Sequence, residues 1–307
     1  MLPLTWRNPS ISTILAGVAA LLISCQPSSQ PTRETRQPSA SAQMEPARPA
    51  GETVWLKAEG LRLKTRIYRS ATLDQAPTLI VVLHGDSPFA PPSYQYRFAQ
   101  QVTDKIENAV VAPILRPGYA DDTGDRSDGK RGLTTGDNYT PEVVRAVAIA
   151  VEQLKARFHP AHTVVVGHSG GAAIAADILG QSPSVADAAL LVSCPCDLSR
   201  WRMHMLKRQA NPMWLIPVSS ISPLAAAGNT PASLHVHMIV GSEDDVAPRW
   251  LTQEYADALR KHEVNVGVTV APGLKHDILL QPVVVEQLKA LVGILSAAQS
   301  QDLREFR

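Results

Sequence analysis

The stretch that decides the fold is Gly167-His168-Ser169-Gly170-Gly171. It follows the apolar run Thr163–Val166 and precedes the small-residue run Ala172–Ala176. A G-x-S-x-G pattern between a strand and a helix predicts a sharp turn that lifts the serine hydroxyl clear of a sheet. The glycines two residues before and after Ser169 provide the space that so crowded a turn needs. The alanines let the helix pack closely beneath the turn, with the positive end of its dipole toward the serine. The pattern predicts a nucleophilic serine.

The composition is that of an ordinary globular protein. The chain has 307 residues, of which 45% are hydrophobic and 19% are charged, and its formal net charge is +1. This length accommodates one large domain or two small ones. Because neither sign of charge dominates, nucleic acid and polyanionic substrates are not expected as main partners. No repeat of 20–50 residues is evident, which argues against a solenoid or a propeller.

The N-terminal segment has the features of an export signal. Arg7 precedes the apolar segment Ile11–Ile23, which is short for a membrane span and typical of the apolar core of a signal peptide. The following Leu22-Ile23-Ser24-Cys25 resembles the bacterial lipobox, whose cysteine is lipidated and becomes the mature N-terminus. We therefore expect residues 1–24 to be a lipoprotein signal peptide and Cys25 to carry the lipid. An ordinary secretory signal is the alternative. The resemblance implies a lipid-anchored protein of the bacterial cell envelope, on the periplasmic face or in the outer membrane.

A linker is expected between this anchor and the folded part. Residues 25–51 are rich in Pro, Ser, Gln and Ala and show no apolar periodicity, so they predict a flexible tether. The folded domain is expected to cover residues 52–307. Two cysteines remain in it, Cys194 and Cys196, on either side of a proline. A disulfide between them and two packed thiols are both compatible with this spacing, whereas a zinc site would need a second pair.

Apolar runs alternate with amphipathic segments along this domain. Strands are predicted at Val54–Lys57, Leu61–Tyr68, Thr78–Leu83, Ala109–Ile114, Thr163–Val166, Ala188–Val192, Leu234–Val240 and Val264–Val270. Helices are predicted after Thr140-Pro141-Glu142, directly after Ser169, and around Val284–Leu295. The continuous apolar runs favour strands buried on both faces, and the alternation in Val264–Val270 favours an edge strand. The pattern predicts a mostly parallel central sheet with helices on both faces.

Taken together, the folded part resembles the α/β-hydrolase superfamily over its whole length. The resemblance is closest to the dienelactone-hydrolase and prolyl-oligopeptidase-like branches. It rests on the order of the motifs along the chain, which is oxyanion strand, serine, acid and histidine. It implies an α/β-hydrolase fold with a short cap inserted at residues 198–230.

Within this family Ser169 is expected to be the nucleophile, and it needs a base to take its proton. His276 lies in the loop after the last strand, where the family places its base. His168 is next to the serine but is expected to point elsewhere, and His235 and His237 alternate along a strand. His276 is therefore the expected base.

The base needs a carboxylate that fixes its tautomer and stabilises the imidazolium. Gly241–Pro248 resembles the acid loop of the family and makes Asp244 the expected triad acid. Asp245 remains a rival, because a shift of one residue in the alignment exchanges the two. Asp197, after the preceding strand, is a more distant third.

Backbone N–H groups must await the charge that develops on the substrate oxygen. Gly170, directly after the nucleophile, supplies one. His84-Gly85-Asp86 resembles the oxyanion segment of the family and makes the Asp86 N–H the second donor. A carboxylate at this position would oppose an oxyanion, so the Asp86 side chain is expected to turn outward or to meet a basic group such as Arg116.

The sequence leaves the roles of two further segments open. The loop 116–139 carries Asp121, Asp122, Asp125 and Asp128, which suit either a solvated loop or, less well, a calcium site. Arg126 or Tyr119 of this loop could face a substrate. Residues 198–230 contain apolar and adaptable side chains that suit a small cap over an acyl pocket or ordinary helix packing; they are Trp201, Met203, Met205, Met213 and Trp214.

The sequence thus predicts a membrane-tethered, exported serine hydrolase that works through an acyl-enzyme with no cofactor and no metal. Carboxylic esters are the expected substrates, because a small cap and a generic pocket suit them. A serine peptidase of the prolyl-oligopeptidase-like type is the alternative, and a non-catalytic envelope binding protein is the third reading. The expected partners are a small-molecule or peptide acyl substrate and the membrane that holds the lipid anchor.

Overall fold

The computed structural model describes the backbone of residues 51–305 and the side chains of residues 51–298. The predicted signal peptide, Cys25 and the predicted linker up to residue 50 lie outside the described residues. Between residues 51 and 305, no helix is both long and apolar enough to cross a membrane.

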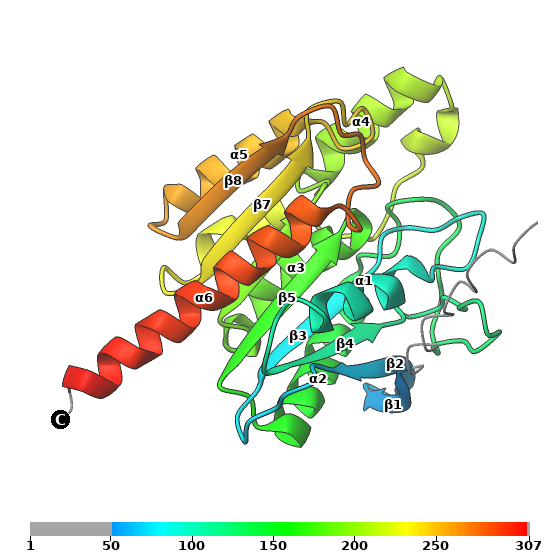
Figure 1. Cartoon of the computed structure of the whole chain (residues 1–307). Coiled ribbons are helices and arrows are strands. Elements are labelled where there is room, and N and C mark those ends of the chain that lie inside the picture. Colours follow the sequence, from blue (N-terminus) through cyan, green and yellow to red (C-terminus); the bar gives the residue numbers. More distant parts are fainter. Residues whose placement is uncertain (1–50, 306–307) are drawn as a thin grey trace, which may run out of the picture. The chain divides into compact units, whose positions relative to one another are not determined.

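Eight strands form one sheet in the order β1-β2-β4-β3-β5-β6-β7-β8 (Figure 1). The strands are β1 Glu52–Ala58, β2 Leu61–Arg69, β3 Thr78–Leu83, β4 Ala109–Ile114, β5 His162–His168, β6 Ala188–Val192, β7 His235–Gly241 and β8 Asn265–Ala271. β2 pairs antiparallel with β1 and β4, and every other pairing is parallel. The predicted mostly parallel sheet is confirmed, and β8 is an edge strand as expected.

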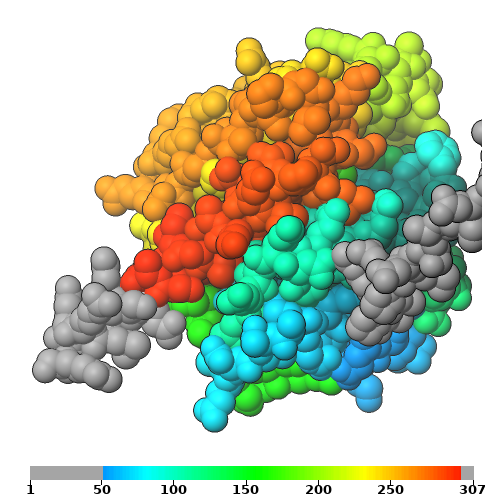
Figure 2. Space-filling view, viewed as in Figure 1, coloured from blue at the N-terminus to red at the C-terminus, as the bar shows by residue number. Residues whose placement is uncertain are grey.

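Helices cover both faces of the sheet. They are α1 Tyr94–Thr103, α2 Pro141–Phe158, α3 Gly170–Gln181, α4 Leu198–Gln209, α5 Arg249–Arg260 and α6 Pro282–Glu305, with short 3₁₀ turns η1 Pro183–Val185, η2 Pro212–Leu215 and η3 Pro223–Asn229. One hydrophobic core joins α2, α3 and α5 to one face, and a second joins α1 and α6 to the other. In Figure 2 the side chains of α6 and α1 lie side by side over that second face.

The two cores follow from the alternation of side chains along each strand. In β3, Leu79, Val81 and Leu83 belong to the first core, whereas Ile80 and Val82 belong to the second. A strand that is buried on both faces must be apolar at every position, which explains its continuous apolar run.

Helix α2 shows how local sequence signals set the two ends of a helix. The Thr140 side chain accepts a hydrogen bond from the Val143 N–H, and Pro141 occupies the first turn of α2. The helix ends at His159 in a left-handed conformation, with φ of 45°. The Thr140 cap and Pro141 are the start signals that the sequence predicted for this helix.

Parallel strands bring their carboxyl ends to one edge of the sheet, and in such folds the site lies at that edge. Leu83 of β3 pairs with Gly167 of β5, which pairs with Leu191 of β6. The loops that follow these strands, and those after β4, β7 and β8, therefore meet there. Each residue of the predicted triad and oxyanion hole lies in one of these loops or at the turn into α3.

The insertion at residues 198–230 is short and forms α4, η2 and η3. The sequence left open whether its apolar side chains form a cap over a pocket or pack in the core, and both exposed and buried side chains are found. Trp201 and Met205 are buried in the first core, whereas Met203 and Met213 are exposed. In the loop before α4, Cys194 and Cys196 form a disulfide, and both are buried.

Candidate active site

Ser169 occupies the sharp turn between β5 and α3. Its backbone has φ of 53° and ψ of −121°, a conformation that non-glycine residues rarely adopt and that stores strain. The turn is tied to the sheet by a 2.8 Å hydrogen bond from the Ser169 N–H to the Val192 carbonyl. The side chain is partly exposed at the start of the helix. The sequence pattern and the observed turn therefore agree.

The flanking glycines are required by close backbone contacts. A Cβ atom on Gly167 would lie 2.4 Å from the Gly171 carbonyl oxygen, and one on Gly171 would lie 2.3 Å from the Leu83 carbonyl oxygen. Both contacts are to backbone, which has little freedom to move. The elbow can be this sharp only without side chains at these two positions.

Three side chains from separate loops form a hydrogen-bonded chain. The Ser169 Oγ lies 2.9 Å from the His276 Nε2, and the His276 Nδ1 lies 3.0 Å from both carboxylate oxygens of Asp244. Asp244 also accepts hydrogen bonds from the backbone N–H groups of Val246 and Ala247. Burial opposes ionisation of Asp244, but the hydrogen bond and charge of His276 and the Ala247 N–H outweigh it and lower the pKa of Asp244.

An ionised Asp244 fixes the tautomer of His276. The carboxylate can only accept, so Nδ1 carries the proton and Nε2 is left free to accept from the Ser169 hydroxyl. In this state His276 can take the serine proton, and the imidazolium that results lies against a buried carboxylate. The arrangement has the geometry of a nucleophile, a base and an orienting acid.

The rival acids and histidines lie elsewhere. The Asp245 carboxylate is exposed and pairs with Arg208. Asp197 caps α4 through the Arg200 N–H. On β7, His235 contacts Asn265 and His237 contacts Thr269.

His168 connects the loops on both sides of the nucleophile. Its Nε2 lies 3.1 Å from the His276 carbonyl oxygen, which can only accept, so Nε2 carries the proton. Its Nδ1 therefore accepts from the Tyr94 hydroxyl at 2.9 Å, and the same hydroxyl accepts from the Gly85 N–H. Burial, together with the nearby His276 ring, lowers the pKa of His168 to about 4, so the ring is neutral at pH 7. One imidazole thus links the segment before Asp86 to the loop that carries the base.

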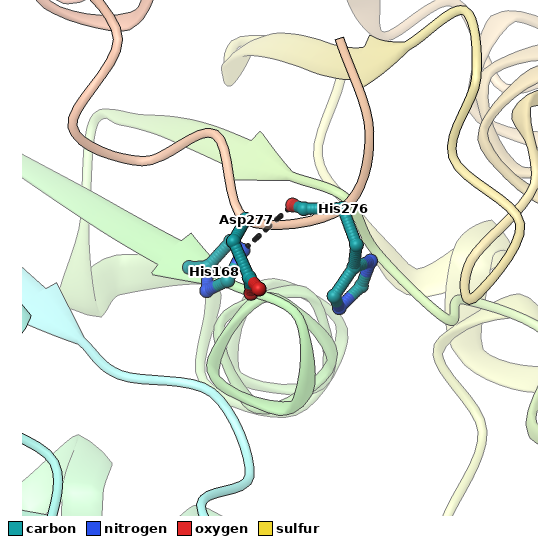
Figure 3. Close-up of side chains that lie close together, drawn as sticks. All are labelled: His168, His276 and Asp277. Atoms are coloured by element: carbon teal, nitrogen blue, oxygen red, sulfur yellow. Dashed lines mark hydrogen bonds between the residues drawn. The ribbon is translucent and has the colours of Figure 1, made fainter. Parts of the chain in front are cut away.

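Figure 3 shows His168, His276 and Asp277 close together, with potential ligand atoms within 4.8 Å of one another. The hydrogen bonds decide against a metal centre at this cluster. Both nitrogens of His168 are engaged by Tyr94 and by the His276 carbonyl, and both nitrogens of His276 are engaged by Asp244 and Ser169. A metal would have to replace these bonds.

The two predicted oxyanion donors are free. Among the described residues, neither the Gly170 N–H nor the Asp86 N–H has a hydrogen-bond partner. Gly85 brings its segment close to the nucleophile, since a Cβ atom there would lie 2.9 Å from the Ser169 Cβ. Two unpartnered donors beside Ser169 could stabilise an oxyanion that develops there.

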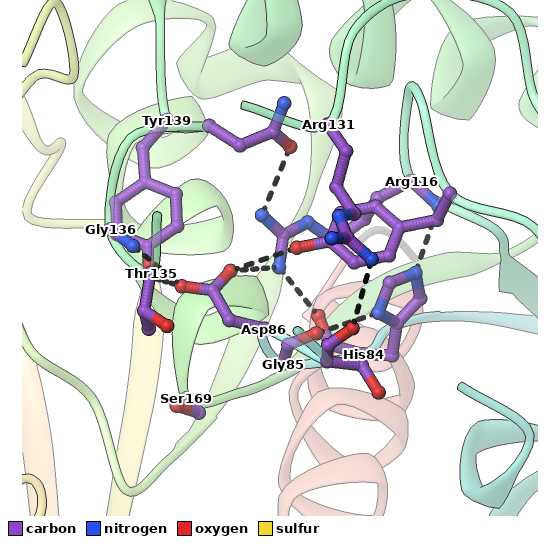
Figure 4. A network of polar contacts seen from close by, with 12 residues as sticks. His84, Gly85, Asp86, Arg116, Arg131, Thr135, Gly136, Tyr139 and Ser169 are labelled. Atoms are coloured by element: carbon purple, nitrogen blue, oxygen red, sulfur yellow. Dashed lines mark hydrogen bonds and ion pairs between the residues drawn. The ribbon is translucent and has the colours of Figure 1, made fainter. Parts of the chain in front are cut away.

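The Asp86 carboxylate lies beside Gly170, where an added Cβ atom would be 2.6 Å from its Oδ1, and it is held in a network of donors (Figure 4). It accepts from the Arg116 Nη1 at 3.0 Å, the Tyr139 hydroxyl at 2.7 Å, the Gly136 N–H at 2.8 Å and the Tyr119 hydroxyl at 3.3 Å. Arg116 is fully buried and also donates to the His84 carbonyl. Burial opposes its charge, but the neighbouring hydroxyls and Asp86 keep the pKa of Arg116 raised. The expected meeting of Asp86 and Arg116 is present.

Four of the five aspartates of the loop 116–139 are held by cations of β2. Lys64 contacts Asp121 and Asp125, and Arg66 contacts Asp121 and Asp122. Asp128 pairs with Arg62 in the same way. The four carboxylates therefore fasten the loop to the sheet, and each has a cationic partner from β2.

Sequence reasoning missed the roles of Tyr94 and Tyr139. Tyr94 opens α1, a helix rich in glutamine that the sequence pattern did not reveal. Tyr139 precedes the well-signalled start of α2 but shows no motif of its own. Each role depends on which loops meet in space, and neither leaves a local signal.

The chain resembles known proteins both in sequence and in fold. Residues 80–220, just under half of the chain, match the sequence model described as "Alpha/beta hydrolase family". No curated protein matches the sequence. The chain has the α/β-hydrolase fold, as the structural neighbours show.

One similar structure is that of Est1E from Butyrivibrio proteoclasticus with bound ferulic acid, with 13% identity, a TM-score of 0.61 and coverage of 80% of this chain and 99% of that chain. A second is the Pyrococcus furiosus esterase Pf2001, with 19% identity, a TM-score of 0.58 and coverage of 80% and 91%. A third is the Pyrococcus horikoshii acylaminoacyl peptidase, with 14% identity and a TM-score of 0.60; 80% of this chain spans only 41% of that chain.

Proposed function

We propose that this chain, which has the α/β-hydrolase fold, is a serine hydrolase that cleaves carboxylic esters through an acyl-enzyme at Ser169. The observation that carries the proposal is the continuous hydrogen-bonded chain from Ser169 through His276 to the buried Asp244. A nucleophile, a base and an orienting acid in hydrogen-bond contact are the parts that acyl transfer needs.

In the proposed mechanism the Ser169 Oγ attacks the ester carbonyl while the His276 Nε2 takes the hydroxyl proton. The carbonyl oxygen becomes an oxyanion and accepts hydrogen bonds from the free N–H groups of Gly170 and Asp86. Asp244 stabilises the imidazolium. The tetrahedral intermediate then collapses, and His276 gives its proton to the departing alcohol oxygen, which leaves an acyl-serine.

Water completes the cycle by the same steps in reverse order. His276 takes a proton from a water molecule as the water oxygen attacks the acyl-serine carbonyl. The second tetrahedral intermediate collapses with return of the proton to the Ser169 Oγ, and the carboxylic acid is released. Ester and water are consumed, and acid and alcohol are produced.

Esters are favoured over peptides by the neighbours in fold. This chain covers 99% of Est1E and 91% of the Pyrococcus furiosus esterase, but only 41% of the acylaminoacyl peptidase. Peptide cleavage is therefore an outcome that the test must be able to reveal.

The test compares the purified full-length protein with three variants on p-nitrophenyl esters of increasing acyl length and on aminoacyl p-nitroanilides. Ester turnover that disappears in Ser169→Ala supports the proposal. Asp244→Asn is expected to lower kcat by about three to four orders of magnitude. Asp245→Asn, the neighbouring carboxylate, is the matched control and is expected to stay close to wild type. Turnover of anilides alone would replace the esterase assignment with a peptidase, and turnover that survives Ser169→Ala would contradict the proposal.

We also propose that the hydrolase is exported to the bacterial envelope and anchored through lipid on Cys25. The lipobox-like Leu22–Cys25 supports this, and so does the disulfide between Cys194 and Cys196, since disulfides persist mainly in oxidising compartments. Cells fed an alkynyl palmitate analogue should label the wild-type protein and not Cys25→Ser. Equal labelling of both proteins, or of neither, would contradict lipidation at this cysteine.

A further inference from the structure

A polar groove lies beside the oxyanion segment and has no part in the mechanism above. Its volume is about 390 Å³, and it runs between Ser87–Pro92 on one side and Gly118–Ala120, Arg126 and Arg131 on the other. Ser87 follows Asp86 directly in the chain. Tyr119, in the opposite wall, donates its hydroxyl to the Asp86 carboxylate. The groove is therefore continuous with the segment that presents the Asp86 N–H, and Figure 4 shows Arg131 in the same view as Asp86 and Ser169.

Both arginines of the groove are anchored by backbone carbonyl oxygens. The Arg126 Nη1 donates to the Gly118 carbonyl at 2.7 Å, and the Arg131 Nη1 contacts the Ser87 carbonyl at 3.4 Å. Within residues 51–298, no carboxylate forms an ion pair with either guanidinium. A guanidinium has five N–H donors, so most donors of each group remain available.

The lack of a counter-charge follows from how the loop is held. Four of its five aspartates pair with Lys64, Arg66 and Arg62 of β2, as described above. The fifth, Asp137, accepts hydrogen bonds from Leu133 and Thr134 of the loop itself. The basic side chains Arg126 and Arg131 are left on the groove side.

The opposite wall is built to hold its shape. Three of its six residues, Pro88, Pro91 and Pro92, are prolines with fixed φ, and the Ser87 hydroxyl closes the loop by donating to the Ala90 carbonyl. A wall that is rigid before binding loses little conformational entropy when a ligand arrives. The groove therefore has the features of a preformed binding site for an anion.

We infer that this groove binds a carboxylate of the substrate, so that the hydrolase prefers esters whose acyl or alcohol part is negatively charged. The inference rests on the proposed function. The planar forks of Arg126 and Arg131 match the two oxygens of a carboxylate, and the position beside Asp86 places the charged end next to the reacting carbonyl.

Two matched pairs of esters test this with the full-length protein. The first pair is p-nitrophenyl hemisuccinate and p-nitrophenyl 4-methylpentanoate, in which an isopropyl group replaces the carboxylate of the acyl chain. The second pair is the butyrate ester of 4-hydroxybenzoate and 4-isopropylphenyl butyrate, which differ in the charge of the leaving group. Their hydrolysis is followed by chromatography. The measured quantity is the ratio of kcat/KM for the charged and the neutral member of each pair. Comparing this ratio between variants cancels the intrinsic reactivity of the esters.

We expect the charged member of at least one pair to be preferred by the wild type. Arg126→Gln and Arg131→Gln should each lower that preference about fivefold, and the double variant more, while kcat/KM for the neutral member changes little. Lys130→Gln is the matched control. It removes one positive charge from the same loop, but Lys130 lines a different cavity and not this groove. It should leave the ratio unchanged.

The outcomes separate this inference from the proposed function. Turnover of the neutral esters with the same charge ratio in the wild type and the double variant would overturn the groove assignment and leave the esterase assignment intact. An equal effect of Lys130→Gln would also overturn it, because the preference would then come from the overall charge of the loop. Absence of turnover for all four esters would overturn the proposed function itself.

Discussion

At the scale of single residues, His168 acts as a link between two loops that flank Ser169. It receives a hydrogen bond from Tyr94, which holds the Gly85 N–H, and it donates to the carbonyl of His276. The link requires a neutral ring with its proton on Nε2, and the depressed pKa of His168, about 4, keeps it in that form at pH 7.

Two isosteric variants of His168 separate these bonds. Asparagine places its amide near the position of Nδ1 and can keep the Tyr94 contact, whereas glutamine places its amide nitrogen near Nε2 and can keep the His276 contact. We expect Tyr94→Phe and His168→Gln each to lower kcat about tenfold, because both loosen the Gly85 segment, with little change in KM. His168→Asn should also lower kcat, because it loses the contact with the carbonyl of His276 and loosens the loop that carries this residue.

The decisive readout is the double variant Tyr94→Phe, His168→Gln. If both single changes break the same link, kcat of the double variant equals that of either single variant. Losses that multiply would contradict the link.

Asp86 combines a backbone role with a side-chain role. Its carboxylate is the counter-charge of the fully buried Arg116. We expect Asp86→Ala to lower the free energy of unfolding by about 3–5 kcal/mol, because it leaves a guanidinium buried and unpaired. Asp86→Asn keeps an acceptor for Arg116 and Tyr139 and should lower it by less. Urea denaturation of the variants measures both values, and an Asp86→Ala protein as stable as the wild type would contradict this account of the pair.

At the scale of the elements, the elbow depends on glycines that no side chain can replace. Gly171→Ala would place a Cβ atom 2.3 Å from the Leu83 carbonyl oxygen, so β3 and α3 would have to separate. We expect it to lower the free energy of unfolding by several kcal/mol, on the order of the larger core substitutions.

Gly293→Ala is the control for this prediction. Gly293 lies in α6 with open space around its Cα, so an added methyl group meets nothing within 4 Å. Alanine there should raise the free energy of unfolding by about 0.5–1 kcal/mol. Thermal denaturation distinguishes the two, and equal melting temperatures for Gly171→Ala and wild type would contradict the packing argument.

The elements also show what the sequence can and cannot predict. Strands such as β3 and the turn at Ser169 could be predicted, because a continuous apolar run and a pair of spaced glycines are local signals of burial and of a sharp turn. α1 was not predicted, since Tyr94–Thr103 has no acidic residue in its first turn and no basic residue in its last turn to mark its ends. The link through Tyr94 was missed for the same reason.

Part of the candidate site could likewise be predicted from the sequence, and part could not. Ser169, His276 and Asp244 were named from motifs in loops after strands, and the structure brings their side chains together. Their catalytic roles remain predictions. The choice between Asp244 and Asp245 needed the structure, because neighbouring residues of a turn point in different directions. The partners of Asp86 are spread along the loop 116–139, from Arg116 to Tyr139, and such a convergence leaves no pattern in the sequence.

At the scale of the whole molecule, α3, the helix that follows Ser169, contains the buried acid Asp177. Both carboxylate oxygens of Asp177 lack hydrogen-bond partners among the described residues, and burial raises the pKa of Asp177 to about 8. The folded protein therefore holds this proton up to about pH 8, whereas the unfolded chain releases it near the ordinary pKa of about 4.

Because the folded state binds this proton more tightly, the contribution of Asp177 to stability is greatest at low pH and is lost as pH rises through this window. The slope from Asp177 is at most about 1.4 kcal/mol per pH unit between roughly pH 4 and pH 8. Asp177→Asn removes this slope and should raise stability at pH 8 relative to wild type. Asp245→Asn, an exposed carboxylate, should leave the slope unchanged. Urea denaturation across this range measures it, and parallel curves for wild type and Asp177→Asn would contradict a neutral buried acid.

Every step of the proposed mechanism depends on Ser169 being an activated nucleophile, and covalent labelling detects this property without a substrate. The full-length protein would be incubated with a fluorophosphonate probe and the labelled peptide identified by mass spectrometry, with Ser169→Ala and Asp245→Asn beside it. We predict one label, on Ser169, which is absent in Ser169→Ala and retained in Asp245→Asn. A folded wild-type protein that takes up no label, or is labelled at another serine, would contradict the central claim.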